Sequence, residues 1–263
     1  MHNIYSQTQT PNESPKFVTE RLADFDRILA KVPSKKKTEY LTALEKCPNE
    51  CSDDFKLVFL RCEVFNVEPA VNRWCNYWKA RVEVFREKAY RSLQANRMDD
   101  KDVQDCSYTQ VASKDDVEGR AIFLIDYQQE ELEMSDDTLV RSVWYSVHQA
   151  LQKESAQQRG IVVFARCGTN LVVSMKRSSV TKKCISNFRG VLPVRLAGCH
   201  VVNPPMFLGV ILKVLKQVIG SKMGKRVYVH SGTTDEVLHS LSRFELGTKE
   251  MLPALFGGFL EFA

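Results

Sequence analysis

Cys167 holds the position in this sequence that is most typical of a catalytic nucleophile, because it directly follows the apolar run GIVVFAR (160–166). A nucleophilic thiol needs a partner that stabilises its thiolate, but no Gly-x-x-Arg loop and no nearby histidine follows Cys167. The sequence therefore favours a structural cysteine here. An enzyme that uses Cys167 is kept as the weakest of three functional hypotheses.

Metal, nucleotide and cofactor sites have sequence signatures that this chain lacks. Cys47 and Cys51 are the only close cysteine pair, and no second pair or histidine pair completes a zinc set. No Gly-x-Gly-x-x-Gly or Walker pattern follows an apolar run. The five histidines show no ligand spacing: His2, His148, His200, His230 and His239. We expect no catalytic residue, no metal and no cofactor.

Basic residues are concentrated in one part of the chain. Between Ser155 and Thr234, 80 residues include 13 Lys or Arg and no Asp or Glu. All 32 acidic residues lie elsewhere, so the molecule is polarised although its formal net charge is only +5. Such a field attracts phospholipid headgroups or nucleic acid. A solvated basic face with no dedicated partner is the alternative.

An apolar segment, MFLGVILKVLKQVIG (206–220), lies inside this basic stretch, directly after Asn203-Pro204-Pro205. At helical period, its polar residues, including Lys213 and Lys216, fall on one narrow stripe. A helix of this length would reach about 21 Å at ~1.5 Å per residue, whereas the hydrocarbon layer of a bilayer is roughly 30 Å thick. It cannot span a membrane. It is instead a buried helix, a partner-binding helix, or one that contacts lipid on one side and protein on the other.

The N-terminal part of the chain has helical periodicity throughout. Apolar residues recur at helical spacing from Phe17 to Val32, and further helices are expected over 38–46, from the capping pair Asp53-Asp54, and after Asn66. The last of these helices has a stripe that is typical of a core: Val71, Trp74, Trp78, Val82 and Phe85.

Four short runs rich in β-branched and aromatic residues follow, and helical patterns separate them. The runs are AIFLID (121–126), GIVVFAR (160–166), AGCHVVN (197–203) and RVYVHS (226–231). The helical patterns cover 136–153, 178–188 and the apolar segment. This alternation predicts the α/β class, with a mostly parallel β-sheet under helical cover.

Four pieces of the sequence, in this order, resemble the CRAL-TRIO lipid-binding family, which includes phosphatidylinositol, tocopherol and retinaldehyde transfer proteins. They are DDFKLVFLRCEVFNVEPAVNRW, LPVRLAGCHVVNPPMF, GKRVYVHSG and LPALFGG. The resemblance implies an all-helical N-terminal lobe and a sheet that floors a hydrophobic pocket, closed by a gate helix formed by the apolar segment. The polar composition predicts disorder over 1–16 and a connection over 96–119. The helical lobe then covers 17–95 and the lipid-binding domain covers 120–263.

The resemblance also implies which residues form the site. The expected pocket lining is Phe123, Ile125, Val163, Phe207, Val210, Ile211 and Val214. When the gate helix opens at a bilayer, its polar stripe, Lys213 and Lys216, would lie among headgroups. Basic residues suited to phosphate oxygens are Arg195, Lys222 and Arg226.

Three positions depart from the family pattern. Glu63 and Ala197 stand where members carry basic residues, and Val194 stands where the phosphatidylinositol-transfer branch has an acid. We therefore do not expect inositol inside the pocket, and phosphoinositide recognition at the rim is a hypothesis.

The first functional hypothesis is a carrier that encloses one hydrophobic ligand, phospholipid or isoprenoid-like, and exchanges it at anionic membranes. The second is a lipid-sensing regulatory module that recruits a signalling protein without transferring lipid. The expected partners are the lipid and an anionic membrane surface, and nucleic acid is not among them. The chain is expected to be a monomer. Because no signal sequence is recognisable at its start, we expect a cytoplasmic location with transient membrane association.

Overall fold

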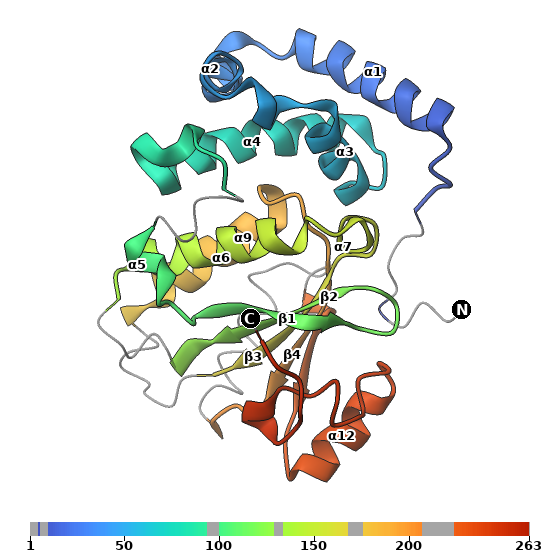
Figure 1. Cartoon of the computed structure of the whole chain (residues 1–263), viewed down its shortest axis with the longest axis vertical. Helices are drawn as coiled ribbons and strands as arrows, with labels where there is room; N and C mark the ends of the chain where they lie inside the picture. The colour runs from blue at the N-terminus through green and yellow to red at the C-terminus, as the bar shows by residue number, and fades with distance from the viewer. Residues whose placement is uncertain are drawn as a thin grey trace.

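The computed structural model describes residues 5, 10–93, 100–128, 134–167, 176–206 and 224–262. A lobe formed by helices α1 to α4 lies on a layer that contains α6 and α9, and this layer covers one face of a β-sheet (Figure 1). Helix α12 lies beyond the sheet on the side away from the lobe. The α/β class and the helical N-terminal lobe are confirmed.

The lobe follows the predicted helices closely. Its α-helices are α1 (Pro15–Lys31), α2 (Thr38–Lys46), α3 (Asp53–Cys62) and α4 (Val67–Phe85), with short 3-10 helices η1 (Ser34–Lys36), η2 (Pro48–Cys51) and η3 (Arg86–Tyr90). In the predicted stripe of α4, Val82 is half-buried and the other four residues are buried.

The cap of α3 differs from the prediction. The Ser52 hydroxyl accepts a hydrogen bond from the Phe55 backbone N–H at 3.3 Å, so Ser52 caps the helix and Asp53-Asp54 do not. The two aspartates occupy the first turn instead, where their negative charge favours the positive end of the helix dipole.

The sheet contains five strands among the described residues, in the order β1-β2-β3-β4-β5. They are β1 (Thr109–Asp115), β2 (Ala121–Asp126), β3 (Ile161–Arg166), β4 (Leu196–Val202) and β5 (Val227–His230). Strand β1 is antiparallel to β2, and the remaining neighbours are parallel. The predicted mostly parallel sheet is confirmed.

Helices of the second half lie on both sides of this sheet (Figure 1). They are α5 (Lys101–Gln104), α6 (Asp136–Ala150), α7 (Glu154–Arg159), α9 (Ser178–Gly190) and α12 (Thr234–Ser242), followed by η5 (Ala254–Phe256). The predicted helices over 136–153 and 178–188 correspond to α6 and α9.

Strand β1 and helix α5 lie within 96–119, the segment that the sequence predicts as a connection. The residues of β1, TQVASKD, lack the continuous apolar run of β2 and become exposed toward Lys114. An outer antiparallel strand can keep polar side chains in water, whereas a strand buried on both faces cannot. The polar composition of β1 therefore concealed it.

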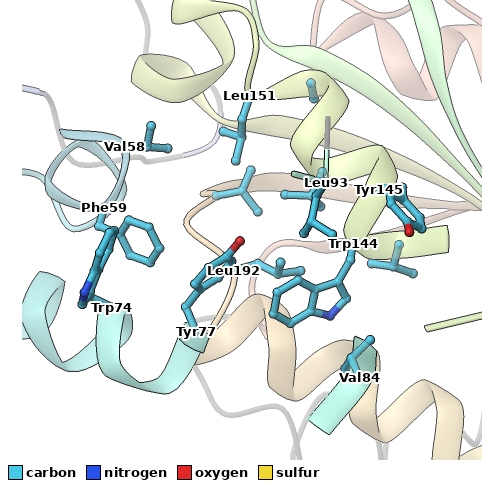
Figure 2. Close-up of a cluster of buried hydrophobic side chains, with 14 of the residues drawn as sticks. Val58, Phe59, Trp74, Tyr77, Val84, Leu93, Trp144, Tyr145, Leu151 and Leu192 are labelled. Atoms are coloured by element: carbon cyan, nitrogen blue, oxygen red, sulfur yellow. The ribbon is translucent and has the colours of Figure 1, made fainter. Parts of the chain in front are cut away.

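One hydrophobic core joins the lobe to the sheet (Figure 2). Tyr77 of α4 lies between the two parts: its ring centroid is 5.3 Å from that of Phe59 in α3 and 5.2 Å from that of Trp144 in α6. All three rings are fully buried. Because large aromatic side chains dominate the energetics of a core, the lobe and the sheet stabilise each other.

A second core lies on the opposite face of the sheet, and Tyr5 is part of it. The sequence predicts disorder over 1–16, but Tyr5 is only 2% exposed and Pro15 already begins α1. The Tyr5 ring stacks on Phe244 at 5.2 Å between centroids, and its hydroxyl lies 2.8 Å from Nε2 of His200. A single aromatic residue in a polar segment has no periodicity, so the sequence pattern did not indicate its burial.

Most of the cysteines are buried, whereas Cys167, for which the sequence favours a structural role, is half-buried. Five of the eight cysteines are buried, and burial raises the pKa of Cys62 to about 11.

In the described part of the chain, no helix combines the length and the apolarity needed to cross a membrane.

Burial also determines how stability should depend on pH. His148 lies in the core beside Tyr77, whose hydroxyl is 3.1 Å from its Nε2, and burial, assisted by the charge of Arg81, lowers the pKa of His148 to about 3. Unfolded histidine takes up a proton near pH 6.5. As the pH falls below this value, the unfolded state binds the additional proton and gains stability relative to the folded state.

We therefore expect His148 alone to lower the free energy of unfolding by about 2 kcal/mol between pH 7 and pH 5. Urea unfolding over this interval should show a smaller loss for His148→Gln than for the unchanged protein. The matched control is His239→Gln, because His239 is exposed, and this variant should keep the original pH dependence. An equal loss in His148→Gln and the unchanged protein would contradict the assignment.

Candidate functional site

Phe123, Ile125 and Val163, three of the residues expected to line a pocket, lie on one face of the sheet. Phe123 of β2 pairs with Val163 of β3, and Ile125 is two residues further along β2, so all three side chains point to the face that α6 covers. All three are buried in the core that includes Val143 of α6. The structure therefore brings them together, and their contact with a ligand stays a prediction.

The same face continues across β4 and β5 with apolar side chains, and those of β5 are less buried than those of β2 and β3. Two rows of paired residues cross the sheet: Phe123, Val163, Cys199 and Val227; and Ile125, Ala165, Val201 and Val229. In the second row, the exposed fraction is 3% at Val201 and 44% at Val229. The β4–β5 half of this face is thus an apolar surface that is partly open. Val227 and Val229 were not among the predicted site residues; their alternation with Tyr228 and His230 is the sequence signal that could have found them.

Seven of the predicted site residues fall outside the described residues. They are Phe207, Val210, Ile211, Val214, Lys213, Lys216 and Lys222, all within 207–223.

The last described residues before this segment are fixed by Asn203. Its side chain donates to the Gly232 carbonyl at 3.1 Å and accepts from the Gly232 N–H at 2.9 Å, so it joins the carboxyl ends of β4 and β5. Asn203 has φ of +45°, a conformation that asparagine tolerates better than most residues. Met206 follows and is almost fully exposed.

Arg195 and Arg226 lie at the amino ends of β4 and β5, directly before Leu196 and Val227. Arg226 Nη1 donates to the Leu196 carbonyl at 2.6 Å. Burial lowers the pKa of Arg195, with a further decrease from the charge of Arg226, and burial also lowers the pKa of Arg226. The two arginines thus form a partly buried electropositive group. The structure thus brings Arg195 and Arg226 together, and their contact with phosphate stays a prediction.

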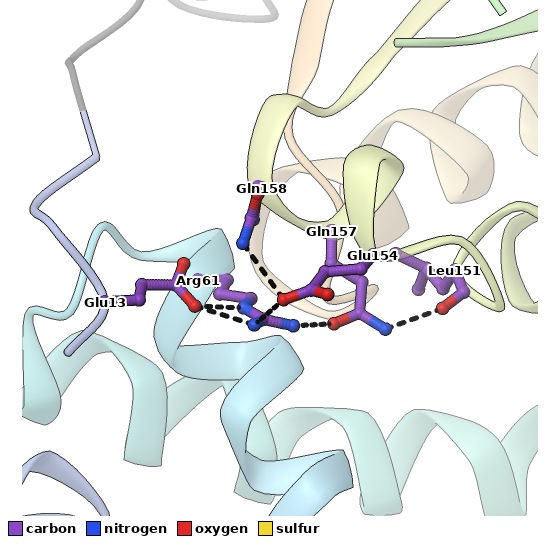
Figure 3. A network of polar contacts seen from close by, with 6 residues as sticks. All are labelled: Glu13, Arg61, Leu151, Glu154, Gln157 and Gln158. Atoms are coloured by element: carbon purple, nitrogen blue, oxygen red, sulfur yellow. Dashed lines mark hydrogen bonds and ion pairs between the residues drawn. The ribbon is translucent and has the colours of Figure 1, made fainter. Parts of the chain in front are cut away.

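Arg61 of α3 lies in the same neighbourhood and was not selected from the sequence. Its guanidinium donates to Glu13 Oε2 from Nε at 2.9 Å and from Nη2 at 2.6 Å, and to Gln157 Oε1 of α7 at 2.5 Å (Figure 3). Nη2 also contacts Glu154 Oε1 at 2.5 Å. Arg195 is close enough to Glu13 and Cys62 for their charges to act on its pKa. Glu13 therefore lies near both Arg61 of the lobe and Arg195 at the amino end of β4.

Glu63, one of the three departures from the family pattern, has its own structural role. Its Oε1 accepts from Arg73 Nε at 2.5 Å, and Arg73 Nη1 donates to the Leu192 carbonyl at 2.8 Å. Arg73 thereby connects the lobe to the loop before β4. Glu63 orients Arg73 for this contact.

Among the described residues, no group of three His, Cys, Asp or Glu side chains could hold a metal ion.

Comparison with known proteins adds a family to this geometry. The CRAL/TRIO domain matches residues 106–258. The chain is 25% identical over 217 residues to the mouse (Mus musculus) protein named "Alpha-tocopherol transfer protein-like", covering 78% of this chain and 58% of that protein. It is 24% identical over 216 residues to "Clavesin-1" of Xenopus laevis, covering 79% of this chain and 61% of the relative. It thus spans about three fifths of the length of these relatives.

A solved structure is also similar. The structure titled "Crystal structure of Sfh5" superposes with a TM-score of 0.52 at 16% sequence identity, covering 84% of this chain and 82% of that one. At this identity, the similarity supports the fold alone.

Arg61 should be hard to replace because its planar guanidinium makes four contacts in a nearly buried position. A lysine ammonium has three donors at a single point and cannot reach all of these oxygens. We expect Arg61→Lys to lower the free energy of unfolding by about 1–3 kcal/mol, as measured by urea unfolding. Arg27→Lys is the matched control because Arg27 forms an exposed pair with Asp24, and it should cause no change. Equal effects of the two substitutions would contradict a special role for Arg61.

Proposed function

The chain belongs to the CRAL/TRIO domain family, and from this we propose that it encloses one hydrophobic lipid and exchanges it at anionic membranes. Relatives named for tocopherol transfer support transport over catalysis. In this proposal, the lobe over 17–95 supports a lipid-binding domain over 120–263. The protein works as a cytoplasmic monomer that associates with membranes reversibly.

The observation that carries the proposal is the apolar face of β4 and β5. Val229 leaves 44% of its surface exposed, and Cys199 and Val227 beside it are half-buried. Apolar side chains in contact with water cost free energy, at roughly 25 cal/mol per Å². A lipid tail on this face would remove that cost. We propose that this half of the face, together with Phe123, Ile125 and Val163, floors the lipid site.

The apolar segment 206–220 is proposed to close this site as a gate helix. Its sequence supports this role because ten of the fourteen residues from Met206 to Ile219 are apolar. In the closed state, these side chains would contact lipid. In the open state, they would enter the membrane while Lys213 and Lys216 remain among headgroups. The soluble form would then be the closed, ligand-filled one.

The headgroup is proposed to lie at the amino ends of β4 and β5, near Arg195 and Arg226, and to reach Arg61 of the lobe. Guanidinium groups present several N–H donors in a geometry that suits phosphate oxygens. Lys222, which precedes β5 in sequence, would add a further charge. Recognition of phosphoinositides at this rim is the finer form of the proposal.

Identification of the bound lipid tests the proposal directly. After incubation with a total lipid extract and re-isolation, mass spectrometry of the protein should detect one enriched lipid class at about one molecule per protein. Val229→Glu places a charge on the proposed floor and should reduce the bound lipid. Val117→Glu is the control because Val117 is exposed on the turn between β1 and β2. No enriched lipid in the unchanged protein would contradict lipid binding.

Exchange between vesicles tests the arginines. We expect Arg195→Ala and Arg226→Ala each to weaken binding to anionic vesicles by about fivefold, because one basic residue near an anionic surface contributes about 1 kcal/mol. Lipid transfer should slow, while bound lipid is retained. Arg27→Ala removes one positive charge from α1, at a distance from the site. It should leave vesicle binding and the rate of lipid transfer unchanged. Unchanged transfer in the arginine variants would contradict the headgroup site. If neither the unchanged protein nor any variant transfers its bound lipid, the result would favour the lipid-sensing module.

A further inference from the structure

The N-terminal segment is fixed to the molecule at two points, Tyr5 and Glu13, which belong to different faces of the structure. We call Tyr5 and the described residues 10–14 the N-terminal strap. Tyr5 is held behind the sheet: its ring packs closely over Gly198 of β4, where a Cβ would lie only 2.4 Å from Tyr5 Cε1. The Arg120 guanidinium lies over the Tyr5 ring, 4.6 Å from the ring centroid. This end of the strap is therefore specifically bound.

Glu13 lies on the other side, at the arginines of the proposed headgroup site. We call these residues, Arg61, Arg195 and Arg226, the arginine group. Its side chain is 13% exposed, and its Oε2 accepts both contacts from Arg61, whose side chain is 9% exposed. Burial of a carboxylate is costly unless charged donors compensate for the lost water. Glu13 therefore depends on Arg61. Ser14 directly after it caps α1, so the position of Glu13 is also fixed by the helix.

The charges around Glu13 are those of an anion site. Glu13 accepts from Arg61 and acts on the pKa of Arg195, and the charge of Arg226 also acts on the pKa of Arg195. The acids that contact Arg61 are Glu13 and the mostly exposed Glu154. Without Glu13, Arg61 would keep one acidic contact, the mostly exposed Glu154. A phosphate group satisfies arginine donors in the same way as a carboxylate does.

We propose that Glu13 is an internal competitor for phosphate-bearing ligands: the strap occupies donors of Arg61 and must release them before such a ligand binds to the arginine group. This inference rests on the proposed headgroup site and adds its regulation. Because Tyr5 and α1 hold both ends of the strap, the competing carboxylate stays close to the arginines at an effective concentration on the order of millimolar. The shared ligand chemistry is a phosphate, either in a lipid headgroup or free in solution.

The first experiment compares Glu13→Gln with the unchanged protein in co-sedimentation with phosphatidylcholine vesicles that contain phosphatidylinositol 4-phosphate. Loss of the competing charge should tighten binding by about fivefold. Glu20→Gln is the matched control: Glu20 is exposed on α1, and its replacement changes the net charge equally but should leave binding unchanged. Equal binding of Glu13→Gln and the unchanged protein would overturn the proposal.

The second experiment uses the unchanged protein and so does not depend on the folding of a variant. A Glu-specific protease should cleave after Glu13 faster when phosphate releases the strap. Acceleration by inorganic phosphate, relative to sodium chloride at equal ionic strength, would support the proposal with free phosphate as a sufficient ligand. Acceleration only by vesicles with phosphatidylinositol 4-phosphate, relative to phosphatidylcholine alone, would support it with a lipid headgroup as the ligand. No acceleration in either case would overturn it.

Failure of the strap and failure of the headgroup site give different results. If Arg195→Ala weakens vesicle binding but Glu13→Gln has no effect, the headgroup site stands and the strap proposal is wrong. If the unchanged protein and Glu13→Gln both fail to bind anionic vesicles, the headgroup site is wrong and the strap proposal falls with it.

Discussion

The alternation of side chains along the strands of the sheet is the constraint on which the rest of the structure depends. Each strand sends successive residues to opposite faces, so β4 serves two environments at once. Cys199 and Val201 point to the face that also carries Phe123 and Ile125, whereas Gly198 and His200 contact Tyr5 on the other face. A shift of one residue in register would exchange these sets. The apolar floor and the site of Tyr5 are therefore determined together.

The second face also shows how polar groups are accommodated in a core. His200 Nδ1 lies 2.9 Å from His230 Nε2, and His230 Nδ1 lies 2.7 Å from Ser240 Oγ. Burial lowers the pKa of His230 to about 4 and lowers that of His200 well below its ordinary value. Both rings are consequently neutral near pH 7. With the hydroxyls of Tyr5 and Ser240 at its ends, a chain of neutral donors and acceptors can be satisfied in either direction, whereas protonation of both rings would place two N–H donors opposite each other.

Charged groups join the lobe to the domain that contains the sheet. Arg61 and Arg73 cross this boundary, and both are nearly buried. Their guanidinium groups gain from several charge-assisted hydrogen bonds, but the lost hydration of the charges offsets much of this gain. The aromatic core around Tyr77 therefore provides most of the free energy that holds the lobe on the domain with the sheet. The arginines fix how the two parts are oriented. This arrangement places lobe residues beside the amino ends of β4 and β5, so a headgroup there would contact both parts.

Local periodicity was sufficient to predict the helices of the lobe, strands β2 to β5 and the parallel sheet, because buried faces require apolar residues at fixed spacing. It missed β1, whose outer position permits polar side chains. The ordered pieces of sequence indicated the family, and they led to Arg195 and Arg226. What the sequence could not determine was the partnership between distant residues: Glu13 with Arg61, Arg73 with Leu192, and Tyr5 with His200. Such contacts have no period along the chain, since folding alone brings their residues together, and they decide which charges are available at the candidate site.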